Sequence, residues 1–113
     1  MKSKDFFGVA QNGKILTGSG FKVRFLLNNH NHARLGITVS RHVSKKACVR
    51  NHIKRHLREY FRKRKSVLPP FDIVFIANSS SAAFSSKDIK KTASKLFKEI
   101  SMNSNVKNFN LNG

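Results

Sequence analysis

Alternation of apolar and polar residues is the first regular pattern along the chain, and it begins after Gly20. Apolar residues at 21, 23, 25 and 27 alternate with Lys22 and Arg24, and a second alternation covers 35–39. Successive side chains of a strand point to opposite faces, so both stretches predict strands, the first with an apolar face and a cationic face. The Asn- and His-rich segment 28–32 between them is typical of a turn and favours an antiparallel hairpin.

A continuous apolar run at 73–77 predicts a third strand, covered on both faces and central in its sheet. In the other segments, the apolar residues recur at helical spacing and predict helices. A short helix is expected between Ser3, a suitable N-cap, and Gly13. A basic helix is expected from after Ser40 to about Lys65, because Pro69-Pro70 then stops it.

The last helix is predicted to begin at Ser85, which with Asp88 three residues later forms a capping-box pattern. Apolar residues then recur at helical spacing as far as Ile100. The segment 103–113 contains five Asn and no periodicity, and it is predicted to be a flexible tail. The chain is therefore expected to form one α+β domain over residues 1–102, in the order α-β-β-α-β-α, with helices packed on a small sheet.

Charge adds a functional expectation to this architecture. The chain has 23 Lys and Arg against five acids, a formal net charge of +18, which predicts a polyanionic partner. Nucleic acid is the first candidate and an anionic membrane surface the second. No apolar run is long enough to span a membrane and no signal-peptide pattern is present, so a cytoplasmic location is expected. The single cysteine, Cys48, cannot form an internal disulfide and fits a reducing compartment.

Eleven of the basic residues lie between Arg41 and Lys65, where Glu59 is the only acid. A helical wheel separates this segment into two faces. The anchoring face consists of Val49, Ile53, Leu57 and Tyr60, with Phe61 at its margin. The opposite face consists of Asn51, Arg55, Arg58 and Arg62, flanked by Lys54 and Lys65. Arginine forks hold phosphate oxygens and an asparagine reads a base edge or a ribose hydroxyl, so this face predicts polyanion binding without choosing between RNA, DNA and lipid.

The stretch ACVRNHIKRHLR, from Ala47 to Arg58, resembles the signature of the bacterial ribonuclease P protein subunit. The segments 35–40 and 71–77 are similar to strands of that family, and residues 3–6 are similar to its first-helix motif. The resemblance implies a ribosomal protein S5 domain 2-like α+β fold with a left-handed βαβ crossover. It also implies that the chain assists a catalytic RNA that removes the 5′ leader of precursor tRNA, with Mg²⁺ held mainly by the RNA.

Roles for particular residues follow from the resemblance. Docking on the catalytic RNA is implied for Arg50, Asn51, Lys54, Arg55 and Arg58, and with them the neighbouring cations Arg41, Lys45, Lys46 and Arg62. Binding of the leader is implied for Phe6, Lys22 and Arg24, although Phe6 fits the core of a short helix equally well. The expected partners are the catalytic RNA and precursor tRNA, with a monomeric protein in a complex of one RNA and one protein.

Three positions depart from the family pattern. His52 replaces the second arginine of the Arg-Asn-Arg motif, Ala10 stands where a phenylalanine is usual, and Arg24 where an aromatic residue is common. A neutral imidazole donates one hydrogen bond, so the contact made by His52 is expected to be weaker or pH-dependent. The leader cleft is expected to rely less on stacking and more on charge.

Other chemistries are disfavoured by the sequence. Cys48, His52 and His56 share one helical stripe, but they lack a fourth ligand and the surrounding cations repel Zn²⁺, so no metal site is predicted. The five acids are scattered over separate segments, so no catalytic residue is expected in the protein, and Asp72 is expected to end a loop. The remaining alternatives are a structural, ribosomal-type RNA-binding protein without a role in cleavage and a basic DNA-binding or membrane-surface module, which lacks the expected motifs.

Overall fold

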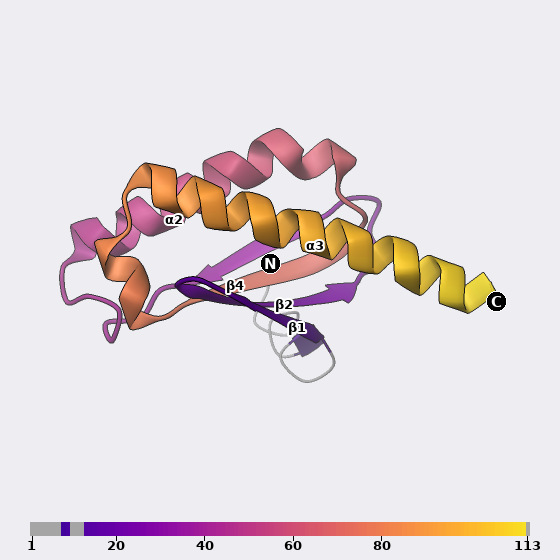
Figure 1. Ribbon diagram of the computed structural model, residues 1–113, viewed down its shortest axis with the longest axis horizontal. Coiled ribbons are helices and arrows are strands. Elements are labelled where there is room, and N and C mark those ends of the chain that lie inside the picture. The colour runs from indigo at the N-terminus through magenta and orange to yellow at the C-terminus, as the bar shows by residue number, and fades with distance from the viewer. Residues whose placement is uncertain (1–7, 10–12, 113) are drawn as a thin grey trace.

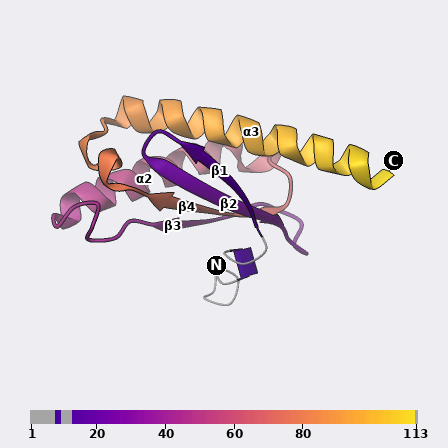
Figure 2. The ribbon, with the colours of Figure 1, turned by 60° about the horizontal axis from the view of Figure 1, so that its bottom comes forward.

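The computed structural model describes residues 8–9 and 13–112, which form a sheet with two long helices on one of its faces (Figures 1 and 2). The strands are β1 (Lys14–Gly18), β2 (Phe21–Leu27), β3 (Arg34–Thr38) and β4 (Phe71–Ala77). The helices are α2 (Ala47–Arg64) and α3 (Ser86–Asn112), with two short 3-10 helices, η1 (Lys65–Val67) and η2 (Ser79–Ala83). In this part of the chain, no helix is both long enough and apolar enough to cross a membrane.

The strand order is β1-β2-β4-β3. β2 pairs antiparallel with β1 and with β4, whereas β3 runs parallel to β4, so α2 forms the crossover of a βαβ unit. The inner position of β4 confirms the prediction from its continuous apolar run. The predicted hairpin between β2 and β3 is wrong, because β4, buried along almost its whole length, lies between these two strands and pairs with both.

The strand β1 was not predicted from the sequence. It is a five-residue edge strand whose residues are exposed or half-buried, so its apolar alternation is weak. A tight connection at Ser19 and Gly20 joins it to β2. Gly20 has a φ of +80°, and a Cβ atom there would lie 2.5 Å from the ring of Phe84. This turn therefore requires glycine both for its backbone conformation and for its close packing.

The core lies between the sheet and the two helices. Its largest fully buried side chains include Phe21 and Phe25 of β2 and Phe71 and Phe75 of β4. The predicted anchoring face of α2 is confirmed: Ile53, Leu57 and Phe61 are buried, and Val49 and Tyr60 are partly buried against the same cluster. Burying an aliphatic or aromatic side chain of this size contributes about 2 kcal/mol. The core thus fixes the rotation of α2 about its axis and determines which side chains face outward.

The basic helix is shorter than predicted at its beginning. Residues 41–46 form turns, in which the Val43 N–H donates to the Ser40 carbonyl oxygen over 3.1 Å, and α2 begins only at Ala47. Val43 is buried in the core, which holds this turn against the domain. At its other end α2 gives way to η1 before Pro69-Pro70, as predicted.

The helix α3 confirms the predicted capping box. The Ser85 N–H donates to Asp88 Oδ2 over 3.0 Å, and the Asp88 N–H donates to Ser85 Oγ over 3.2 Å. These hydrogen bonds hold the pKa of Asp88 below its usual range. The helix continues to Asn112, because no Pro or Gly interrupts it before Gly113, and the flexibility of the tail 103–113 stays a prediction.

Most of the predicted first helix lies outside the described residues. Gly8 and Val9 are helical, and Val9 is buried. The Gly13 N–H donates to the Val9 carbonyl oxygen over 2.8 Å, and β1 begins at the next residue. The chain therefore turns into the sheet at the glycine that the sequence marked as a stop.

Candidate nucleic-acid interface

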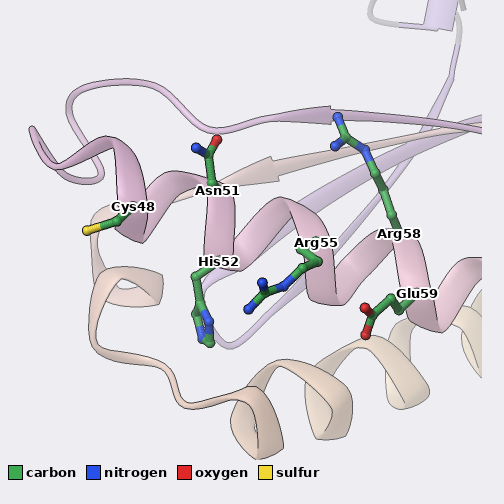
Figure 3. A pocket seen from close by; sticks show the side chains of 6 residues that line it. All are labelled: Cys48, Asn51, His52, Arg55, Arg58 and Glu59. Atoms are coloured by element: carbon green, nitrogen blue, oxygen red, sulfur yellow. The ribbon is translucent and has the colours of Figure 1, made fainter.

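The outward face of α2 carries Asn51, Arg55, Arg58 and Arg62, and we call this set the α2 ridge. All four residues are exposed. Figure 3 shows the first three projecting from successive turns of α2. Because the opposite face of α2 is fixed in the core, these side chains are held in register at one-turn intervals. The predicted separation of an anchoring face and a cationic face is confirmed.

An open cavity of about 730 Å³ lies along the α2 ridge (Figure 3). Its lining residues are Cys48, Asn51, His52, Arg55, Arg58 and Glu59. Two guanidinium groups, an amide and an imidazole thus line one open hollow, and its single acid is Glu59. Such donors suit an anion with several acceptor oxygens, as a phosphate group has.

Arg50 has a structural contact that the sequence did not reveal. Its Nη1 atom donates to the Ser44 carbonyl oxygen over 2.8 Å, and Ser44 Oγ accepts from the Lys46 N–H over 3.2 Å. Arg50 therefore braces the turn segment 41–46 against the beginning of α2. Three other residues implied in RNA docking, Arg41, Lys45 and Lys46, lie exposed in that segment.

His52 and His56 pack edge to face, with their ring centroids 4.5 Å apart. The Nδ1 atom of His56 is buried without a hydrogen-bond partner and lies 4.0 Å from a carboxylate oxygen of Glu59. Burial lowers the pKa of His56, and the nearby His52 and Arg55 lower it further. The two rings therefore act as packing neighbours, and no group of three His, Cys, Asp or Glu suited to a metal occurs among the described residues.

If the α2 ridge docks on RNA, as the resemblance implies, the replacement His52→Arg is expected to strengthen that contact. It would place a second permanent cation beside Arg55 and restore the Arg-Asn-Arg pattern that the resemblance implies. We expect affinity for ribonuclease P RNA to rise several-fold at low salt, and the slope of log affinity against log salt to steepen by roughly 0.9. Filter binding over a salt series measures both quantities. An unchanged slope would show that residue 52 does not face a phosphate.

The face of the sheet opposite the helices carries the cations implied in leader binding. Lys22 and Arg24 lie on β2 beside Ile76 and Val74 of β4, respectively, and Lys22 is exposed while Arg24 is half-buried. Phe6 and Ala10, the other positions of this prediction, lie outside the described residues. The structure thus places two of the predicted residues on one face and leaves the aromatic one as a prediction.

The sequence predicted that Asp72 ends a loop, and this prediction is wrong. Asp72 lies within β4, is 7% exposed, and accepts two hydrogen bonds from Arg34 over 2.7 Å each and one from Asn28 over 2.9 Å. Burial alone would raise the pKa of Asp72, but these hydrogen bonds and the charge of Arg34 outweigh it and hold the pKa below its usual range. Through these hydrogen bonds the Asp72 carboxylate links β4 to β3 and to the segment that follows β2.

Comparison with known proteins assigns the family. The family model described as Ribonuclease P matches residues 1–101 of this sequence. The chain belongs to the ribonuclease P protein family. It is 36% identical over 99 residues to the ribonuclease P protein component of Clostridioides difficile, covering 86% of each chain. Against that of Coxiella burnetii it is 35% identical over 85 residues, which are 75% of this chain and 70% of the relative.

Solved structures of ribonuclease P proteins share the fold. The Staphylococcus aureus protein superposes with a TM-score of 0.82 at 31% identity, covering 87% of this chain and 90% of that one. The Thermotoga maritima protein superposes with a TM-score of 0.79 at 34% identity, and the match covers 88% of this chain and 96% of that one. The predicted family and the predicted single α+β domain class are confirmed. The chain is a ribonuclease P protein component of the bacterial type, which implies a role in an RNA-processing endoribonuclease.

Proposed function

We propose that this chain binds the catalytic RNA of ribonuclease P through the α2 ridge and the turn segment 41–46. The observation that carries the proposal is the exposed row of arginines on a helix whose other face is fixed in the core. Like charges at one-turn spacing destabilise a helix without a ligand, and phosphates would relieve that repulsion. Asn51 in the same row offers a donor and an acceptor to a base edge or a ribose hydroxyl.

In this proposal the protein aids cleavage and the RNA performs it. The described acids Glu59, Asp72, Asp88 and Glu99 lie on three different elements, and Asp72 is occupied by Arg34. Magnesium prefers hard oxygen ligands such as phosphates, which the RNA supplies in abundance. The reaction is the Mg²⁺-dependent endonucleolytic removal of the 5′ leader, giving the mature tRNA 5′ end. The active particle would contain one RNA and one monomeric protein.

The face of the sheet opposite the helices would bind the single-stranded leader. Lys22 and Arg24 would neutralise its backbone, and Phe6 would stack on a base, a combination that tolerates different sequences. Together the α2 ridge and this sheet face would place the catalytic RNA and its substrate on different sides of one small domain.

The direct test is leader removal with purified components. The protein is added to a bacterial ribonuclease P RNA and a precursor tRNA at low Mg²⁺, and the release of the leader is followed over time. We expect strong stimulation by the protein and no cleavage by the protein alone. Failure to stimulate, together with tight binding to ribosomal RNA, would instead identify a structural RNA-binding protein.

A paired replacement tests the leader surface separately. We expect Lys22→Ala with Arg24→Ala to lower the affinity of the protein–RNA complex for precursor tRNA several-fold, because two backbone contacts are lost. Affinity for mature tRNA, which lacks the leader, should not change, and neither should affinity for the catalytic RNA. An equal loss for precursor and mature tRNA would place these cations outside the leader site.

A further inference from the structure

A second cavity lies where the α2 ridge ends, between the end of α2 and the segment 28–33 that connects β2 to β3. It has a volume of about 370 Å³. Its lining residues are Asn31, His32, Arg62, Lys65, Ser66 and Leu68. In Figure 1 the chain leaving β2 turns back into β3 close to this end of α2. The cavity therefore joins two segments that lie 30 residues apart in the sequence.

The segment 28–33 is held in place by the buried carboxylate of Asp72. The Asn28 side chain donates to Asp72 Oδ1 over 2.9 Å and to the His32 carbonyl oxygen over 3.2 Å. The Asn28 N–H donates to the Pro70 carbonyl oxygen over 2.9 Å, and Asn28 Oδ1 accepts from the His30 N–H over 2.8 Å. The backbone that carries His32 is thus positioned before any ligand binds, which reduces the entropy lost on binding.

The cavity has cationic and hydrogen-bonding groups with no acid among its lining residues. Arg62 and Lys65 are exposed, one helical turn apart, and neither makes an ion pair with any residue that the structure describes. The acid that anchors the neighbouring segment, Asp72, is already paired with Arg34. His32 completes the set from the opposite side, with His30 at a ring-centroid distance of 6.0 Å within its own segment. The charge of this cavity is therefore uncompensated.

We propose that this cavity binds a backbone phosphate of the same RNA that occupies the α2 ridge, and that His32 contributes to the contact. The inference rests on the proposed function, because it extends that RNA surface from α2 onto the segment 28–33. Arg62 belongs to both surfaces and gives them continuity. The Arg62 guanidinium, the Lys65 ammonium, the Ser66 hydroxyl and the His32 imidazole are all donors to phosphate oxygens. A phosphate favours the charged imidazolium, which donates from both nitrogens.

The experiment is a double-mutant cycle on RNA affinity with His32→Ala, Lys65→Ala and both together. We expect each single replacement to weaken binding of the full-length protein to ribonuclease P RNA about three- to tenfold. The combined loss should be smaller than the product of the single losses, because both side chains contact one phosphate. Lys65→Ala should also reduce the salt slope by roughly 0.9, because one phosphate contact is lost.

Two controls separate this inference from the proposed function. His30→Ala removes an imidazole from the same segment without altering the lining of the cavity, and it should leave affinity unchanged. Arg55→Ala reports on the α2 ridge in the same assay. If Arg55→Ala weakens binding while His32→Ala and Lys65→Ala do not, the phosphate site is refuted and the proposed function stands. If the RNA binds equally well to every variant, both are refuted.

Discussion

Simultaneous replacement of Arg55 and Arg58 by alanine is expected to weaken binding to ribonuclease P RNA by roughly 100-fold. Both side chains are exposed and line the open cavity along the α2 ridge, where each can hold a phosphate through two parallel hydrogen bonds. Loss of two phosphate contacts should also reduce the salt slope by roughly 1.8. Filter binding or fluorescence titration over a salt series measures the affinity and the slope together.

The control for this prediction removes the same number of charges elsewhere. Lys87 and Lys91 are exposed at the beginning of α3, and they belong neither to the α2 ridge nor to the linings of its cavity and of the His32 cavity. Replacing both with alanine should change affinity only slightly, through the net charge. Neither pair is buried, so thermal unfolding should remain close to that of the unmodified protein. Equal losses from the two pairs would mean that the RNA responds to total charge and does not dock on α2.

Replacement of Asp72 by alanine is expected to lower the free energy of unfolding by about 3 kcal/mol, near the lower end of the cost of breaking a buried ion pair. The lower end applies because the Arg34 side chain is 21% exposed and water partly compensates its charge. Asn28 also loses its acceptor, so the segment 28–33 should loosen. Urea unfolding followed by circular dichroism measures the change.

The pH dependence of the same variant provides an independent check. The pKa of Asp72 is lower in the folded protein than in the unfolded chain, so its stabilising contribution is fully present above the unfolded pKa of an aspartate. That contribution disappears as the pH falls through the folded pKa. Asp72→Ala should therefore flatten the acid limb of the stability profile. A double replacement, Asp72→Leu with Arg34→Met, should recover part of the loss, because it leaves no unpaired charge. An acid limb unchanged by Asp72→Ala would contradict this assignment.

The elements that sequence reasoning placed correctly are those whose periodicity reports local burial. The apolar stripe of α2, the run in β4 and the capping box of α3 each depend on neighbours within one element. The pairing of strands, in contrast, depends on residues of different elements that are far apart in the sequence. β2 and β3 alternate well enough to form a hairpin, and only the burial of β4 on both faces explains why it lies between them. The edge strand β1 escaped prediction because nearly all of its side chains remain partly in solvent.

The candidate site divides in the same way. The α2 ridge follows from a helical wheel, and the RNA partner that we propose for it follows from the signature between Ala47 and Arg58. The cavity with His32 could not be predicted, because Arg62 and His32 are brought together only by the order of the strands and by the contact between Asn28 and Asp72. The hydrogen bond from Arg50 to Ser44 was likewise invisible, since it depends on where α2 begins.

The central position of β4 sets the order in which the chain can fold during its synthesis. The hairpin of β1 and β2 is local, but Phe25 pairs with Ile73, and Leu35 also pairs with Ile73. Neither sheet contact can form until β4 has left the ribosome, and the core is complete only when α3 follows. The basic helix is therefore synthesised before the surface that anchors it exists. Until β4 and α3 have been made, the apolar stripe of α2 has no core to pack on and stays exposed together with its cations.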